Sequence, residues 1–290
     1  MSLTSAMRYT IKDFNKQFPD DDACLDYIFK ERYGKHYKCE QCGDDKFYRV
    51  KNRKAYACPQ GHQVNPTAGT IFHKSATSMK SWFFAMFLMS ISKNGVAALE
   101  LQRQIGVTYK TAWRMAKQIR KLMEQDPSML SGTVEADETY IGGKGGNNKR
   151  GRGAENKTAV VGIVQRKGNV KAQAVENVRA ATIKPILQEN IEQGSELITD
   201  EFRSYNKSTV YGFDHKTIRH AAKEYVRGAI HTNTIEGFWS QLKRSIDGTF
   251  HKVSPKHLQA YVNEFAWRYN HRKSEQPLFS LLAQQVGRSV

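Results

Sequence analysis

The sequence predicts a mixed α+β fold in three successive parts, and three observations support this. Two cysteine-containing knuckles lie within residues 39–62, helical periodicity follows to about residue 128, and strand patterns then alternate with helices. We therefore expect domains at 1–75, 76–128 and 129–290. They would be an N-terminal helix with a metal-bound ribbon, a helical region, and a mixed sheet with flanking helices.

The charge balance indicates a polyanionic partner. The 290 residues include 45 Lys and Arg against 28 Asp and Glu, which gives a net charge of +17 and a pI near 9.7. Such an excess repels itself in a compact chain, so nucleic acid is the expected partner. A membrane surface is the competing partner, but the sequence carries neither a basic amphipathic membrane helix nor a lipidation signal.

Neither a targeting segment nor a membrane span is expected. The N-terminal residues lack the apolar core of a signal peptide. The longest apolar run, residues 82–91, is far shorter than the roughly 20 residues that a bilayer requires. We interpret this run as a buried helix and expect a cytoplasmic, nucleoid-associated protein.

The N-terminal cysteines have the spacing of a zinc site. A CxxC and a CxxxH knuckle together supply Cys39, Cys42, Cys58 and His62. Three thiolates and one imidazole form a set of tetrahedral zinc ligands, and the flanking KFYRVKN and KAYACP are typical of short ribbon strands. The alternatives are scattered buried cysteines or a redox CxxC, although a thioredoxin-like context is missing. We predict one structural Zn²⁺ in a zinc ribbon, with Cys24 in a helix core.

Residues 76–128 are predicted to contain a DNA-binding helix pair. GVAALELQRQIGV and TYKTAWRMAKQIRKLMEQ read as two helices that meet at Gly106, as in a helix-turn-helix, with Thr108 placed to cap the second. The polar side of that second helix is basic, which is typical either of a solvated face or of DNA contact. In a chain of this charge we favour contact with DNA, mainly with phosphates. The residues concerned are Lys110, Arg114, Lys117, Arg120 and Lys121.

The remaining residues predict a mixed sheet. GTVEADETYIGG, residues 132–143, reads as a strand, and residues 158–178 read as two strands around a Lys167-Gly168-Asn169 turn. The glycine-rich basic segment between them, residues 144–157, is expected to be a mobile loop. ATIKPILQENIEQ then reads as a helix, and SELITDEFRSY opens with a short buried strand. This order is compatible with an RNase H-like architecture.

Three acids are placed to converge on this sheet. Asp137 and Asp200 are expected at strand ends, and Glu236 lies near the start of the helix in TNTIEGFWSQLKR, 35 residues beyond Asp200. Lys243 follows Glu236 by seven residues, so both project from one face. Converging carboxylates can hold two divalent cations about 3.5–4 Å apart for phosphoryl transfer. Taken singly, each acid could instead be a surface or capping residue, and the neighbouring Glu135 and Glu138 could be merely exposed.

In combination these motifs resemble a known family. ADETYIGGK, LITDEFRSY and HTNTIEGFWSQLKR, together with GTIFHKS and HLQAYVNEFAWRYNHR, resemble DDE-superfamily transposases of prokaryotic insertion sequences. Within that superfamily the chain looks like the group with an N-terminal zinc ribbon and an RNase H-like catalytic domain. The resemblance implies that Asp137, Asp200 and Glu236 bind two Mg²⁺ or Mn²⁺ ions, with Asn233 as the alternative third ligand. It further implies that Lys243 contacts the substrate strand near the scissile phosphate, and we expect Arg244 to contact DNA beside it.

The resemblance also implies a reaction and a partner. Water would cleave a strand at each element end, and the freed 3′-hydroxyl would attack target DNA without a covalent protein–DNA intermediate. The ends would be paired by a homo-oligomer, at least a dimer, on double-stranded DNA. The rival interpretations are a DNA-binding regulator that has lost catalysis and a simple RNase H-like nuclease.

Overall fold

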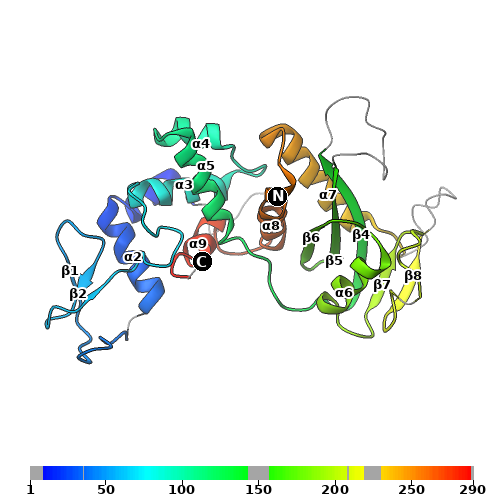
Figure 1. The fold of residues 1–290 in the computed structure, drawn as a ribbon, viewed down its shortest axis with the longest axis horizontal. Helices are drawn as coiled ribbons and strands as arrows, with labels where there is room; N and C mark the ends of the chain where they lie inside the picture. Colours follow the sequence, from blue (N-terminus) through cyan, green and yellow to red (C-terminus); the bar gives the residue numbers. More distant parts are fainter. Residues whose placement is uncertain (1–8, 35, 143–156, 208, 219–229, 289–290) are drawn as a thin grey trace. The chain divides into compact units, whose positions relative to one another are not determined.

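The computed structural model describes residues 9–34, 36–142, 157–207, 209–218 and 230–288, and it divides into two compact units. The first unit comprises residues 1–123 and 274–290, and the second comprises residues 124–273 (Figure 1). Almost all of the basic segment expected as a loop, residues 144–156, lies outside the described residues. Within the described ranges, every helix is too short or too polar to cross a bilayer.

The first unit is a helical assembly with a small sheet. Its helices are α1 (Ile11–Gln17), α2 (Asp21–Tyr33), α3 (Met79–Ile91), α4 (Ala98–Ile105), α5 (Tyr109–Arg120) and α9 (Leu278–Ala283). Its antiparallel sheet has the order β1 (Tyr48–Arg49), β2 (Tyr56–Ala57) and β3 (Gln63–Val64). The apolar run at residues 82–91 forms the buried helix α3, as predicted.

Aromatic side chains hold this unit together. Phe14 and Phe18 pack against Phe83 and Phe87 of α3, and all four are almost fully buried. Phe279 of α9 joins the same cluster, with its ring centroid 5.8 Å from that of Phe14. Helix α9 lies within the range 129–290 that we expected to form one domain, but it packs in the first unit. The predicted division at 75/76 and 128/129 stays a prediction.

Helices α4 and α5 form the expected helix-turn-helix. The chain turns at Gly106, whose φ of 76° lies in the left-handed region that glycine adopts without strain. Two residues later the Thr108 hydroxyl accepts a hydrogen bond from the backbone N–H of Thr111 at 3.3 Å, which caps α5. The sequence signals at both positions are therefore confirmed.

The second unit is built on a five-stranded mixed sheet. Its strands are β4 (Thr133–Gly142), β5 (Lys157–Gln165), β6 (Val170–Val175), β7 (Glu196–Thr199) and β8 (Asp214–Thr217). Their order is β6-β5-β4-β7-β8, in which β4, β5 and β6 are antiparallel while β7 is parallel to both β4 and β8. The helices are α6 (Ala180–Asn190), α7 (Asn233–Ser245) and α8 (Pro255–Asn270), with a short π-helix, Ile246–Phe250, after α7. The predicted mixed sheet with flanking helices is confirmed.

The two faces of the sheet are covered by different helices. Strand alternation sends Val160 and Val164 of β5 into one core with α7 and α8, whereas Val161 and Ile163 enter a second core with α6. The β4 side chains divide in the same way. Because Glu135 and Asp137 are two residues apart, both lie on the α7 face.

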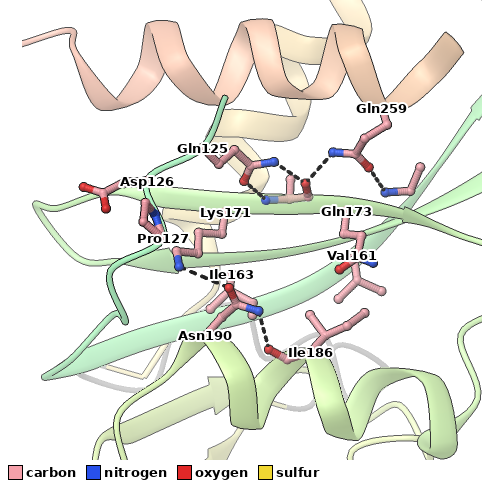
Figure 2. A pocket seen from close by; sticks show the side chains of 12 residues that line it. Gln125, Asp126, Pro127, Val161, Ile163, Lys171, Gln173, Ile186, Asn190 and Gln259 are labelled. Carbon is pink, nitrogen blue, oxygen red and sulfur yellow. Dashed lines mark hydrogen bonds between the residues drawn. The ribbon is translucent and has the colours of Figure 1, made fainter. Parts of the chain in front are cut away.

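Amide side chains cover the free edge of β6. Gln125 both donates to the Ala172 carbonyl, at 2.7 Å, and accepts from the Ala172 N–H, at 2.8 Å, in the way a neighbouring strand would (Figure 2). From α8, Gln259 accepts from the Ala174 N–H, and Asn270 makes a paired contact with Val170. An edge strand with satisfied backbone groups does not invite pairing with another chain.

Candidate active site and metal centre

The sheet register brings the two predicted aspartates to one place. Strand β4 pairs in parallel with β7 from Thr133 to Glu135, and β7 ends at Thr199. Continuing the register by two residues puts Asp137 opposite Asp200, just beyond the last paired residues. We had expected Asp137 to end its strand, and this was wrong. Strand β4 continues to Gly142 in its pairing with β5. What ends near Asp137 is the parallel pairing with β7, and carboxyl ends of parallel strands are where ligands gather.

A third carboxylate completes a tight cluster. Oxygen atoms of Asp137, Glu138 and Asp200 all lie within 4.8 Å of one another. From the sequence Glu138 could be merely an exposed acid, whereas in the structure it is only 8% exposed. The Tyr205 hydroxyl donates to its carboxylate at 3.3 Å, from a ring that is 5% exposed. This contact could not be foreseen because the partners are 67 residues apart.

Helix α7 supplies the other expected groups. Glu236 and Lys243 line the same cavity of about 530 Å³ as Asp137, Glu138 and Asp200. The Glu236 carboxylate accepts a hydrogen bond from the Thr232 hydroxyl at 2.9 Å. Asn233, the alternative ligand, is exposed at the first residue of α7, and the residues that line the cavity do not include it.

A glycine allows α7 to lie close against the sheet. Gly162 of β5 pairs with Asp137, and a β-carbon at Gly162 would lie only 2.5 Å from the Trp239 ring. The indole therefore occupies the space that a side chain would fill. From there Trp239 Nε1 donates to Asp137 Oδ2 at 3.0 Å. The site is thus connected directly to the packing of α7.

The electrostatics of the cavity follow from this crowding. Burial, then the charges of Asp200 and Glu236, raises the pKa of Asp137 to about 6, against the lowering effect of hydrogen bonds from the Glu138 backbone and Trp239. Desolvation lowers the pKa of Lys243, and the negative charge of Asp137 opposes that shift. A divalent cation would relieve the repulsion among the carboxylates, and oxygen atoms are the ligands that Mg²⁺ prefers.

The four predicted zinc ligands converge in the first unit. Cys39 Sγ and Cys58 Sγ lie 3.6 and 3.5 Å from His62 Nδ1, and Cys42 Sγ lies 3.5 Å from Cys58 Sγ. A tetrahedral ion with bonds of about 2.0–2.3 Å requires ligand separations of about 3.3–3.8 Å. The donor set and its spacing therefore fit one zinc ion. Cys24 is fully buried in α2 and lies outside this group, as expected.

The basic helix α5 presents only part of the predicted DNA-binding set. Lys110, Lys117 and Lys121 are exposed. Arg114 is partly buried, with its guanidinium 6.0 Å from the Trp82 ring centroid, and Arg120 is 4% exposed. Arg120 thus belongs to the buried side of α5, beside Ala116, because the apolar stripe is wider than its spacing in the sequence implied. Arg244 is exposed on α7 and donates to the Ser240 hydroxyl.

Sequence comparisons identify relatives for both units. Residues 129–270 match the ISXO2-like transposase domain, and residues 19–60 match the transposase zinc-ribbon domain. A Haemophilus influenzae protein described as an uncharacterized transposase-like protein is 32% identical over 124 residues, which is 43% of this chain and 98% of that protein. A Halobacterium salinarum protein described as an uncharacterized protein in transposable element ISH50 is 27% identical over 277 residues, 87% of this chain and 92% of its own length.

Solved structures show only distant likeness. A simian T-cell lymphotropic virus intasome in complex with PP2A regulatory subunit B56 gamma has a TM-score of 0.34 at 14% identity, covering 69% of this chain and 71% of that chain. The Mos1 transposase paired-end complex with the left transposon end has a TM-score of 0.23 at 15% identity, covering 72% and 80%. The assignment rests instead on the sequence matches, which span the zinc-ligand cysteines and the acidic cluster. The chain belongs to the ISXO2-like transposases.

Proposed function

We propose that this transposase cleaves and joins DNA strands at the ends of an insertion sequence, with Mg²⁺ or Mn²⁺ as cofactor. The observation that carries the proposal is the cluster of Asp137, Glu138 and Asp200, whose oxygens lie within 4.8 Å of one another. Glu236 and Lys243 line the same cavity, so carboxylates and the ammonium group of a lysine lie together there. Such a pairing suits the binding of metal and of phosphate side by side.

The residues would divide the work by their chemistry. Asp137, Asp200 and Glu236 would hold the divalent cations, and Glu138, restrained by Tyr205, would be a fourth carboxylate within reach. A divalent cation held there would activate the attacking oxygen and stabilise the leaving oxygen. Lys243 would contact a phosphate of the substrate strand, for which its charge is suited. Trp239 holds Asp137 in one orientation through its Nε1–H.

Double-stranded DNA is the proposed partner of both units. The exposed Lys110, Lys117 and Lys121 would bind phosphates, and the +17 charge of the chain would draw DNA to the protein. One structural Zn²⁺ would hold the ribbon through Cys39, Cys42, Cys58 and His62. Pairing of two ends calls for at least a dimer on DNA.

The test is strand transfer by the purified protein. The substrate is a DNA fragment that carries the sequences flanking the gene, and the target is a supercoiled plasmid. With Mg²⁺ the wild-type protein should nick the ends and join them to the plasmid. Asp200→Ala should reduce strand-transfer activity by a factor of at least about 1000 while retaining end binding. Asp214→Asn, an exposed aspartate of β8, is the matched control and should remain active.

The possible outcomes separate the rival functions. End binding without any Mg²⁺-dependent cleavage would indicate a regulator. Nicking without joined product would indicate a nuclease. Joined product from Asp200→Ala would refute the assignment of this residue.

A further inference from the structure

We propose that Glu135 is a positioning residue whose buried carboxylate holds the first turn of α7, and thereby sets where Glu236 stands relative to Asp137 and Asp200. The inference rests on the proposed function for the meaning of Glu236. From the sequence Glu135 could be merely an exposed acid, whereas in the structure its side chain is 0% exposed.

The carboxylate of Glu135 caps a helix from across the fold. Its Oε2 accepts from the backbone N–H of Thr234 at 2.8 Å and of Ile235 at 3.1 Å, and its Oε1 accepts from the Thr234 hydroxyl at 2.8 Å. The first N–H groups of a helix have no partner within the helix, and the helix dipole favours a negative charge beside them. A strand residue 99 positions earlier therefore does what a local capping residue usually does.

The local capping residue is used elsewhere. Thr232 occupies the N-cap position of α7, but its side chain makes no capping hydrogen bond. Its hydroxyl instead donates to Glu236 Oε1 at 2.9 Å, from a residue that is 1% exposed. Because Glu135 satisfies the helix N-terminus, Thr232 is available to orient the carboxylate of Glu236.

An arginine fastens the same region. Arg166 Nε donates to Glu135 Oε1 at 2.8 Å, and Arg166 Nη2 donates to the His231 carbonyl at 2.9 Å, immediately before α7. His231 Nδ1 lies 3.5 Å from Glu135 Oε1. A buried carboxylate is costly unless it is paired and hydrogen-bonded, and here the arginine and the helix end together provide both. The His231 ring thus lies beside both members of this pair, since its Nδ1 is also 3.2 Å from Arg166 Nη2.

These contacts distinguish positioning from metal binding. Both Glu135 oxygens are engaged by α7 or Arg166, and Glu135 is not among the residues that line the cavity. Two residues further along the same face of β4, Asp137 holds Trp239. Strand β4 thus contacts α7 through two side chains, Glu135 at the first turn and Asp137 at Trp239. Glu236 lies between these contacts. Loss of the Glu135 contacts should leave the helix docked through Trp239 while its first turn becomes more mobile.

The experiment compares two buried glutamates. Glu135→Gln weakens the grip on α7. Glu264→Gln is the matched control, because Glu264 is also 0% exposed and pairs with Arg268 at 2.7 Å, within α8. Three quantities are measured for each full-length variant: amide hydrogen exchange of residues 233–236 in the metal-free protein, the Mn²⁺ dissociation constant, and the melting temperature.

Glu135→Gln should speed amide exchange of residues 233–236 and raise the Mn²⁺ dissociation constant, each about tenfold. Loss of a group that orients a metal ligand typically weakens metal binding by at least this factor. Glu264→Gln should lower the melting temperature while leaving both other quantities at wild-type values. Wild-type exchange and affinity in Glu135→Gln, or an equal shift in Glu264→Gln, would overturn the proposal.

Two further arms keep the test decisive. If Glu135→Gln does not fold, Thr234→Ala removes only one of the three hydrogen bonds from α7 and should give a smaller shift in the same direction; no shift would overturn the proposal. If the wild-type protein cleaves no DNA with metal, the proposed function fails. The exchange measurement still decides whether Glu135 holds α7.

Discussion

The close packing of α7 against Gly162 of the sheet can be tested with the substitution Gly162→Ala. A β-carbon at this position would lie 2.5 Å from both Cη2 and Cζ2 of Trp239 and 3.0 Å from Cδ1 of Ile235. Carbon atoms in good contact are about 3.5–4.0 Å apart, so the indole must retreat by about 1 Å. That retreat stretches the 3.0 Å hydrogen bond from Trp239 Nε1 to Asp137.

The magnitude follows from this displacement. Overpacking of a well-filled core costs about 1–3 kcal/mol, and we expect the free energy of unfolding to fall by that amount. A shift of about 1 Å in a catalytic array can cost about 100-fold in rate, so strand cleavage should suffer more than stability. The measurements are denaturant unfolding and single-turnover nicking of an end substrate.

A second substitution shows whether the ring is the cause. Trp239→Phe removes the outer ring atoms that the new methyl group meets. In that background Gly162→Ala should therefore cost little stability, which gives a coupling energy comparable to the original loss. An undiminished cost in the double variant, or wild-type cleavage by Gly162→Ala, would refute this reasoning about α7.

The remaining predictions concern pH, zinc and DNA. Because the pKa of Asp137 is raised to about 6, the metal-free protein should lose stability as the pH rises from about 4 through 6. Asp137→Asn should remove this loss. Melting curves at pH 4 and 8, with and without Mg²⁺, measure both effects. Elemental analysis should find one zinc per chain in the wild type and in Cys24→Ser but much less in Cys39→Ser, and full zinc in Cys39→Ser would show the ligand set to be wrong. Lys117→Ala and Lys121→Ala should each weaken DNA binding and reduce the slope of log K against log salt concentration by about 1. Arg120→Ala should instead lower the melting temperature. An equal effect of all three variants on the slope would contradict the burial of Arg120.

The predictions that rested on local sequence were accurate where spacing alone determines geometry. Two knuckles of four and five residues bring Cys39, Cys42, Cys58 and His62 together once the ribbon strands pair. Gly106 and Thr108 likewise act on their immediate neighbours. The order of strands and helices along the sequence correctly predicted a mixed sheet, because alternation and turn residues are recognisable within about ten residues.

Features that depend on distant partners could not be predicted. Glu135 and Glu138 looked like surface acids because their partners, Thr234 and Tyr205, lie 99 and 67 residues away. Arg120 looked like part of a basic face, since helical periodicity gives the direction of a side chain but not the width of the buried stripe. The packing of α9 within the first unit has no local signal. The catalytic roles of Asp137, Asp200, Glu236 and Lys243 stay predictions.

The most direct test is to locate the cation. Crystals of the full-length protein soaked in Mn²⁺ can be measured at an anomalous wavelength, with Asp200→Ala crystals as the control. We predict an anomalous peak about 2.1–2.2 Å from carboxylate oxygens of both Asp137 and Asp200, absent from the variant. A wild-type map without such a peak at saturating Mn²⁺, or a peak that persists in Asp200→Ala, would contradict a metal-dependent active site at the junction of β4 and β7.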